Sequence, residues 1–296
     1  MKDRTLYSIG ETARTCEVTP RMLRHYESLG LLKPDRVDPS SHYRYYSVET
    51  MRRLQTIRYL VDEGFSLEEI RDAITSDDLE GLQAKFMEKI DETQEKIEYY
   101  HQRLDSLKSW AALIIEGKQT LRHRETEIKT RFLPQQPYFY YIEDFTGSSL
   151  SPRECDAYIE TRYFTQSKGY GHSMVDMGGA FHVLYDSYQD RLDGRNTKMT
   201  LLQILFPNSK SREKTMEFGG FMAVTSYHIG PLSEIGDTYR RMIEWTREHG
   251  YELEGNSCER HILDVYSTVN EDNFVTEVLL PVKGNYQELG LLHNWK

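Results

Sequence analysis

The chain has 296 residues, of which 38% are hydrophobic and 28% are charged, and its formal net charge is −10. This balance excludes a disordered chain, and the length leaves room for two domains with their own cores. No apolar run approaches the roughly 18 residues that a membrane span needs.

The start of the chain and its cysteines indicate a cytoplasmic protein. Met1 is not followed by the apolar stretch of a signal peptide, so we expect none. Cys16, Cys155 and Cys258 are far apart and odd in number, which predicts a reducing compartment and no disulfide framework. Cys16 lacks a Cys or His neighbour at ligand spacing, so we expect it in the core rather than on a metal.

Charge is divided unevenly along the chain. Residues 1–61 contain eleven Lys and Arg against seven Asp and Glu, a balance of +4, which leaves −14 for residues 62–296. A basic head suits contact with phosphate, and an acidic body tolerates or attracts cations.

The first 30 residues predict two short helices joined by a turn. Ser8 and Glu11 form a capping box at the start of the first helix. Thr19 caps the second, with Pro20 at its first position. Three cationic residues lie on or near one side of this second helix: Arg21, Arg24 and His25. This is the pattern of a helix-turn-helix, although a solvated basic face on an ordinary helix has the same pattern.

Further signals follow the second helix. Gly30 is a left-handed helix end, and Pro34 prevents continuation. Residues 37–46 alternate around a turn at 38–41, as a short two-stranded wing would. Ser47 caps a third helix, and a capping box at 66–69 starts a fourth.

Five motifs in order resemble one family. They read Tyr7-Ser-Ile-Gly-Glu11, Arg24-His-Tyr-Glu27, Gly30-Leu-Leu-Lys-Pro34, Tyr43-Arg-Tyr-Tyr46 and Gly64-Phe-Ser-Leu-Glu-Glu-Ile70. Together they cover nearly all of residues 5–75 and resemble the DNA-binding head of the MerR family of transcription regulators. The resemblance implies a second helix in the major groove of double-stranded promoter DNA and a wing on the adjacent backbone.

Carried over residue by residue, the resemblance places six side chains at the DNA. Four lie on the recognition helix, one near the phosphates and one on the wing: Thr19, Arg21, Arg24 and His25, then Tyr26, then Arg44. Arginine can take guanine or a phosphate in two hydrogen bonds, and hydroxyl and imidazole groups can donate to phosphate. The alternative for Arg24 is an internal ion pair with Glu27 or Glu11.

Residues 77–118 predict one long helix that ends near Gly117. Its apolar residues recur at alternating threes and fours, as in a heptad seam. The seam consists of Leu79, Leu82, Phe86, Ile90, Thr93, Ile97, Tyr100, Leu104, Leu107, Ala111 and Ile114. The simplest partner that could bury it is a second copy of the helix, and the alternative is packing on its own domain. The MerR resemblance implies an antiparallel coiled coil in a homodimer, which presents two heads to a pseudo-palindromic site.

Metal-sensing members of that family carry cysteines at and just beyond this helix. Here no cysteine lies between residues 17 and 154. We therefore expect no metal site and no cofactor.

Beyond residue 120 the chain predicts a separate domain of two similar halves. Residues 126–134 read as a polar linker with a short extended piece, and residues 138–142 as a strand. Three pairs align at a constant offset of 81: Tyr158 with Tyr239, Gly169-Tyr170 with Gly250-Tyr251, and Tyr185 with Tyr266. Each half reads strand, helix, Gly-Tyr, strand, strand, which predicts a pseudo-twofold domain with a cleft between the halves.

The second half carries the clearer motifs. They are Ser226-Tyr-His-Ile-Gly-Pro231, His249-Gly-Tyr251, Cys258-Glu259 and Val275-Thr-Glu-Val278. They resemble the GyrI-like small-molecule-binding domain of the SOUL-haem-binding-like superfamily. Together with the head, the arrangement resembles the multidrug-sensing branch of MerR proteins, which binds lipophilic cations and activates efflux genes.

The resemblance implies that Glu259 lies at the pocket floor and meets the ligand's positive charge. A buried carboxylate without a partner is costly, so a cation would neutralise it. The alternative is a surface acid on an edge strand, paired with Arg260 or a nearby lysine. Strand alternation puts His261 on the face of Glu259. Because the chain has 21 Tyr and 11 Phe, aromatic lining is expected, although each candidate could be core: Phe274, Tyr227, Tyr266 and Tyr141.

The sequence thus predicts an α+β multidomain protein. A winged helix-turn-helix head occupies residues 1–75, a coiled-coil dimerisation helix 76–120, and a GyrI-like effector domain with βαββ repeats 121–296. We expect a ligand-responsive activator that distorts promoter DNA so that RNA polymerase can read it. We do not expect an enzyme. Two alternatives stay open: a small-molecule hydrolase that uses Glu259 and His261, and a drug-sequestering module.

Overall fold

The protein divides into two units, and the division falls between Glu98 and Tyr99. The computed structural model describes residues 5–283 except 77 and 196. Helix α5 (Leu79–His123) contributes residues to both units. Among the described residues, no helix is both long enough and apolar enough to cross a membrane.

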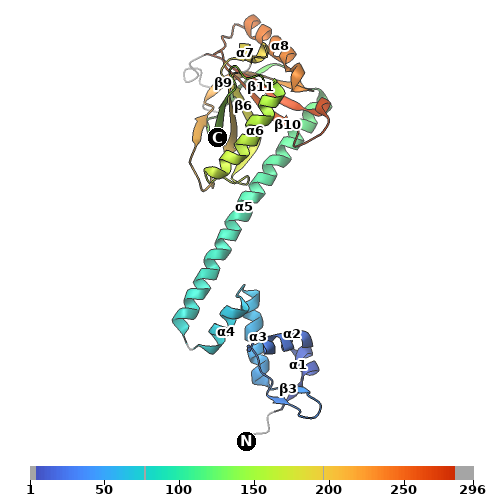
Figure 1. Cartoon of the computed structure of the whole chain (residues 1–296). Helices are drawn as coiled ribbons and strands as arrows, with labels where there is room; N and C mark the ends of the chain where they lie inside the picture. The colour runs from blue at the N-terminus through green and yellow to red at the C-terminus, as the bar shows by residue number, and fades with distance from the viewer. Residues whose placement is uncertain (1–4, 77, 196, 284–296) are drawn as a thin grey trace. The chain divides into compact units, whose positions relative to one another are not determined.

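The first unit is a winged helix-turn-helix (Figure 1). Its elements are β1 (Tyr7–Ser8), α1 (Ile9–Thr15), α2 (Pro20–Ser28), β2 (Arg36–Val37), β3 (Arg44–Tyr46), α3 (Val48–Asp62) and α4 (Leu67–Thr75). The capping boxes at Ser8 and Ser66 are confirmed, as are the caps at Thr19 and Ser47. Strands β2 and β3 pair antiparallel, which confirms the wing.

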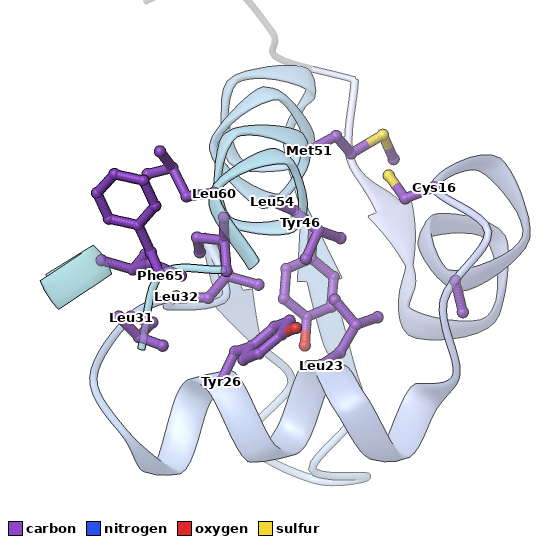
Figure 2. Close-up of a cluster of buried hydrophobic side chains, with 13 residues drawn as sticks. Cys16, Leu23, Tyr26, Leu31, Leu32, Tyr46, Met51, Leu54, Leu60 and Phe65 are labelled. Atoms are coloured by element: carbon purple, nitrogen blue, oxygen red, sulfur yellow. The ribbon is translucent and has the colours of Figure 1, made fainter. Parts of the chain in front are cut away.

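The core of this unit forms where α2, α3 and β3 meet. Figure 2 shows Leu23 and Tyr26 reaching from α2 toward Tyr46 of β3. Leu54 and Ile57 of α3 belong to the same cluster and are fully buried. Because the apolar side of α2 packs against this cluster, its polar side faces solvent.

Helix α5 is longer than expected, and the prediction that it ends near Gly117 is wrong. The helix continues to His123. Gly117 lies instead at a close contact, because a Cβ atom added there would lie 2.3 Å from Cγ of Leu263. The glycine therefore allows the helix to approach the sheet of the second unit rather than stopping it.

The second unit is built on an eight-stranded sheet in the order β4-β9-β11-β10-β6-β7-β5-β8. The strands are β4 (Lys129–Leu133), β5 (Gln136–Asp144), β6 (Met177–Tyr185), β7 (Lys198–Leu205), β8 (Thr215–Phe218), β9 (Phe221–Ile229), β10 (Ser257–Leu263) and β11 (Val275–Pro281). The helices are α6 (Pro152–Gly169), α7 (Tyr188–Leu192) and α8 (Ile235–Glu248), with short 3₁₀ turns η1 (Leu232–Glu234) and η2 (Glu271–Asn273). The predicted linker at residues 126–134 supplies β4, which pairs with β9.

The two predicted halves are confirmed by the strand order. One half runs β5, α6, β6, β7 and the other β9, α8, β10, β11, and they join where β6 pairs with β10. One cluster packs Ile159 and Tyr163 of α6 on the first half. A second cluster packs Tyr239 and Met242 of α8 on the other.

The C-terminal part of α5 packs on the opposite face of the sheet from α8. Leu113 of α5 belongs to a cluster with Ala180 of β6 and Ile262 of β10. Neighbouring residues on a strand point to opposite faces, so β10 presents Glu259 to α8 and Arg260 to α5. This alternation gives the sheet two separate polar clusters, one on each face.

Candidate functional site

The exposed side of α2 carries three of the six residues predicted to meet DNA. Arg21, Arg24 and His25 are exposed, while Leu23 and Tyr26 point inward. Thr19 is exposed too, and its hydroxyl oxygen accepts the N–H of Met22 at 3.1 Å. The helix therefore presents cationic and hydrogen-bonding groups over a fixed apolar base.

Tyr26 and Arg44 are more constrained than the other four. The Tyr26 side chain is 5% exposed, and burial raises the pKa of its hydroxyl. Arg44 lies on β3 and its Nε donates to Oε2 of Glu27 at 2.7 Å. The partner of Glu27 is therefore Arg44 of the wing. The alternative ion pair between Arg24 and Glu27 is not formed.

The second unit contains a cleft between its two halves, with a cavity volume of about 890 Å³. Helix α6 forms one wall, and η1 and the first turn of α8 form the other. Strands β10 and β11 supply His261 and Thr276 at the base. This volume lies within the range of small-molecule sites, about 300–1,000 Å³.

Beside the base of the cleft, Glu259 is fully buried and already paired. Nε and Nη2 of Arg191 donate to its two carboxylate oxygens at 2.7 and 3.1 Å, and the Tyr239 hydroxyl donates to Oε1 at 2.9 Å. Burial by itself raises the pKa of Glu259, but the Arg191 guanidinium outweighs it, so the net pKa lies below the ordinary value. The guanidinium also lies 5.0 Å from the ring centre of Tyr185.

Two further carboxylates face the cleft from α6. Asp156 and Glu160 are one helical turn apart and half-buried, and both line the cavity. Burial raises the pKa of each carboxyl group, against the lowering influence of Arg191 on Asp156 and of His261 on Glu160. The Tyr266 hydroxyl donates to Oε2 of Glu160 at 3.0 Å.

His261 is the buried polar group without a partner in this cleft. Its side chain is 5% exposed, and its Nε2 atom has no hydrogen-bond partner among the described residues. An orphaned buried nitrogen is costly, because it has lost water and gained nothing in return. A ligand in the cleft would supply the missing partner.

The structure brings some predicted effector residues together and separates others. His261 and Phe274 line the cleft, and Glu259 lies beside it beneath Arg191. Tyr266 reaches the cleft only through Glu160. Tyr227 donates instead to Glu116 of α5 at 2.9 Å, and Tyr141 donates to Glu143 of its own strand at 2.5 Å. Phe274 is the single aromatic residue among the described lining residues.

On the opposite face of the sheet, Arg260 links α5 to the strands. Its guanidinium donates to both oxygens of Glu116 at 2.8 and 2.6 Å and to Oε2 of Glu277 at 2.7 Å. Arg131 donates to the same Glu277 oxygen at 3.2 Å. The edge-strand alternative for Glu259, with Arg260 as its partner, is therefore wrong: β10 is an interior strand, and Arg260 faces the other way.

Sequence reasoning missed Arg191, Asp156 and Glu160. Arg191 lies in a five-residue helix, too short for a periodic signal. Asp156 and Glu160 had a usable signal, since acids four residues apart share one side of a helix. Nothing local connects that side with a strand more than 90 positions away. Within the described residues, no group of three or more His, Cys, Asp or Glu could hold a metal ion.

Comparison with known proteins gives the same two parts. Residues 7–77 match the family described as MerR HTH family regulatory protein, and residues 177–283 match the GyrI-like small molecule binding domain.

Three relatives can be compared along the chain. The multidrug-efflux transporter 2 regulator of Bacillus subtilis (strain 168) is 24% identical over 295 residues, covering 94% of this chain and 96% of the relative. The multidrug-efflux transporter 1 regulator of the same organism is 36% identical over 93 residues, 31% of this chain and 33% of the relative. The mercuric resistance operon regulatory protein of Bacillus cereus is 33% identical over 114 residues, 38% of this chain and 83% of the relative.

Proposed function

The chain belongs to the MerR family of regulatory proteins, and from this premise we propose how it works as a ligand-responsive transcription regulator: a homodimer binds promoter DNA and distorts it when a lipophilic cation occupies the cleft. The observation that carries the proposal is the acidic cleft of about 890 Å³ in a domain that matches a small-molecule-binding family. Two relatives are named regulators of multidrug-efflux transporters, which supports a drug-like small molecule as the ligand.

A homodimer is supported by the exposure of the α5 seam. The seam residues that stay exposed within the single chain include Ile97, Tyr100, Leu104 and Leu107, with exposed fractions of 51%, 61%, 48% and 59%. The face of α5 that packs on the sheet is a different one, with Gln102, Ser106 and Leu113 buried. An apolar stripe of this length in water needs a partner, and a second copy of α5 supplies one with the same repeat.

Oligomeric state tests this part of the proposal. Replacing Ile97 and Leu104 together by Asp should convert the dimer to monomer in analytical ultracentrifugation, because both aspartates would be buried in the seam. Ala84→Asp, an exposed position outside the seam, is the matched control and should leave the dimer intact. A wild-type chain that sediments as a monomer at micromolar concentration would refute the dimer.

DNA contact is proposed for Thr19, Arg21, Arg24 and His25 on α2, with Tyr26 beneath them and Arg44 on the wing. Arg21→Ala or Arg24→Ala should weaken binding, and each lost phosphate contact should reduce the slope of log affinity against log salt by about 1. Arg71→Ala on α4, outside α2 and the wing, is the control. An unchanged salt slope in both α2 variants would remove these arginines from the interface.

The distortion of DNA is the link between ligand and transcription. We propose that the ligand-bound dimer bends and untwists a promoter so that RNA polymerase can read both of its elements. The ligand must bind the activating state more tightly than the resting state, since equal affinity shifts nothing. A footprint on the protein's own promoter, with and without a lipophilic cation, should show enhanced cleavage at the centre of the site. Tetraphenylphosphonium and protonated 1-adamantylamine are the two probes. Absence of protection at any sequence would end this proposal.

We propose that the cleft binds its ligand without converting it. Glu259 is held by Arg191 and Tyr239 with no exposed surface, so it has little freedom to move a proton for a substrate. A turnover assay decides between binding and hydrolysis. A product that forms with the wild-type chain and is lost in Glu259→Gln would favour the hydrolase.

A further inference from the structure

We infer that Asp156, Glu160 and His261 form a subsite for a cation that carries at least one N–H, such as a protonated amine or an amidinium, attached to an apolar body. The inference rests on the proposed function, since it names the ligand class of the same cleft. It differs from the sequence expectation, in which Glu259 meets the ligand's charge.

Glu259 is not available to a ligand while Arg191 holds it. Arg191 makes two hydrogen bonds to it and Tyr239 a third, and the carboxylate has no exposed surface. Arg191 is itself 10% exposed at its side chain and lies over Tyr185. The pair is therefore an internal salt bridge with its charge balanced inside the fold, and an incoming cation must find another anion.

The carboxylates of Asp156 and Glu160 are the anionic groups that an incoming cation can meet. Among the described residues, neither forms an ion pair, whereas Glu271 at the rim is paired with Arg153 at 2.8 Å, and Asp237 with Arg240 at 2.5 Å. Their positions one turn apart on α6 bring the two carboxylates to the same side of the cleft. Both carboxylates have acceptor capacity left, since the hydroxyl of Tyr266 occupies only one position on Glu160.

His261 provides the second, independent observation. Its Nε2 atom is buried, has no partner among the described residues, and belongs to a residue that lines the same cleft. His261, Asp156 and Glu160 all line this one cleft. An N–H cation can donate to carboxylate oxygens and to an unprotonated imidazole nitrogen, which are the acceptors that these residues can offer.

The rest of the lining excludes recognition by aromatic rings. Quaternary ammonium ions have no N–H and are held in proteins by cages of several aromatic faces. Of the described residues that line this cleft, Phe274 alone is aromatic, and the remaining apolar surface comes from aliphatic residues such as Leu192, Leu232 and Ile235. The cleft therefore favours a ligand with an aliphatic or compact apolar body. A cation without an N–H group should bind more weakly, because it cannot donate a hydrogen bond.

Three probes with one body separate charge from hydrogen bonding. They are 1-adamantylamine, its N,N,N-trimethyl quaternary derivative and 1-adamantanol, titrated calorimetrically into the full-length chain. The protonated amine should bind at least about tenfold more tightly than either of the others, which corresponds to about 1.4 kcal/mol. Asp156→Asn and Glu160→Gln should each remove most of that preference, and His261→Phe should reduce it.

Controls keep the result interpretable. Glu244→Gln changes the same charge on the exposed side of α8, outside the cleft, and should leave all three affinities unchanged. Thermal unfolding of each variant checks that the domain remains folded. Equal binding of the amine and the quaternary ion, or an amine preference that survives both acid variants, overturns the subsite. So does failure of all three probes to bind.

The proposed function has its own readout. A footprint that responds to tetraphenylphosphonium while the adamantyl series shows no N–H preference would refute the subsite and leave the regulator intact. A footprint indifferent to every cation, together with amine binding in the cleft, would refute the regulatory response and leave the subsite standing.

Discussion

On one face of β10, Arg260 joins Glu116 of α5 to Glu277 of β11, and Arg131 completes a chain of four charges. On the other face, Glu259 pairs only with Arg191 among the described residues, and Asp156 and Glu160 of the cleft form no ion pair there. The first cluster is closed and ties a helix to the sheet. The second lies beside a cleft lined by Asp156, Glu160 and His261, whose Nε2 atom has no hydrogen-bond partner in the described part of the chain.

Adjacent residues of β10 therefore have two roles: one set supports the cleft, and the other binds α5. Residues 259, 260 and 261 alternate between the faces, so the strand that supports the cleft also holds the C-terminal part of α5.

Arg260→Met should be the most damaging change. It leaves Glu277, whose side chain is 2% exposed, and Glu116 without their shared guanidinium. Removing one partner of a buried ion pair costs about 3–5 kcal/mol, because the remaining charges stay buried. Chemical denaturation of the full chain measures the loss. Arg260→Lys keeps the charge but cannot bridge two carboxylates, so an intermediate value is expected, and a wild-type value for either variant would show that the cluster is not structural.

Arg191→Met should lower the free energy of unfolding by less, about 3 kcal/mol at neutral pH, because Tyr239 still donates a hydrogen bond to Glu259. In the wild type the pKa of Glu259 is lowered, so its stabilising contribution is present above the unfolded pKa and lost as pH falls through the folded pKa. In the variant, burial is unopposed and raises the pKa, so protonation relieves the penalty as pH falls. The difference between the two proteins should therefore narrow from about pH 7 to about pH 5.

Arg195→Met is the matched control for Arg191→Met. Arg195 is 60% exposed and pairs with Asp190 and Asp193 at the surface, where ion pairs contribute little. A loss as large as that of Arg191→Met would mean that the α7 region, rather than the buried pair, sets the stability.

Gly117→Ala should have a smaller effect on the α5 face. The new Cβ would lie 2.3 Å from Cγ of Leu263, and such overpacking typically costs about 1–3 kcal/mol, offset by about 1 kcal/mol of helix propensity. Gly169→Ala in α6 meets no atom within 4 Å and should be neutral or stabilising. Thermal unfolding of both variants tests the close approach, and equal behaviour would refute it.

The smallest effect concerns the pH dependence of cation binding in the cleft. The pKa values of Asp156 and Glu160 are raised by burial, so both acids protonate earlier than usual as pH falls. Affinity for 1-adamantylamine should drop by less than about tenfold between pH 7 and pH 5.5, and binding near the lower pH should release protons. The charged and titratable neighbours that set these pKa values are Arg191, Glu259, His261, Asp264, Tyr185 and Tyr266.

Calorimetry in two buffers of different ionisation enthalpy measures that proton release. The same burial means that these two groups favour the folded state more at low pH than at high pH, the opposite sign from Glu259. A constant affinity with no proton release would show that the acids remain ionised throughout, or that the amine does not meet them.

Features that depend on near neighbours along the chain could be predicted from the amino-acid sequence. The caps at Ser8, Thr19, Ser47 and Ser66 each accept from the N–H three positions away, so their signals are local and were confirmed. The wing and the doubled strand-helix-strand-strand pattern were equally readable from turns and alternation. The heptad seam was visible as a repeat, and its burial by a second chain stays a prediction.

Contacts between residues far apart in the chain could be identified only in the folded structure. Arg191 and Glu259 are 68 positions apart, and Arg260 and Glu116 are 144 apart. No local pattern distinguishes Gly117 as a contact from Gly117 as a helix end, because the atom that decides it belongs to Leu263. A residue's preference for helix, strand or turn depends on its own backbone and its near neighbours. The partner of a buried charge depends instead on how the whole sheet folds, so the separation of two residues along the chain does not predict the distance between them in space.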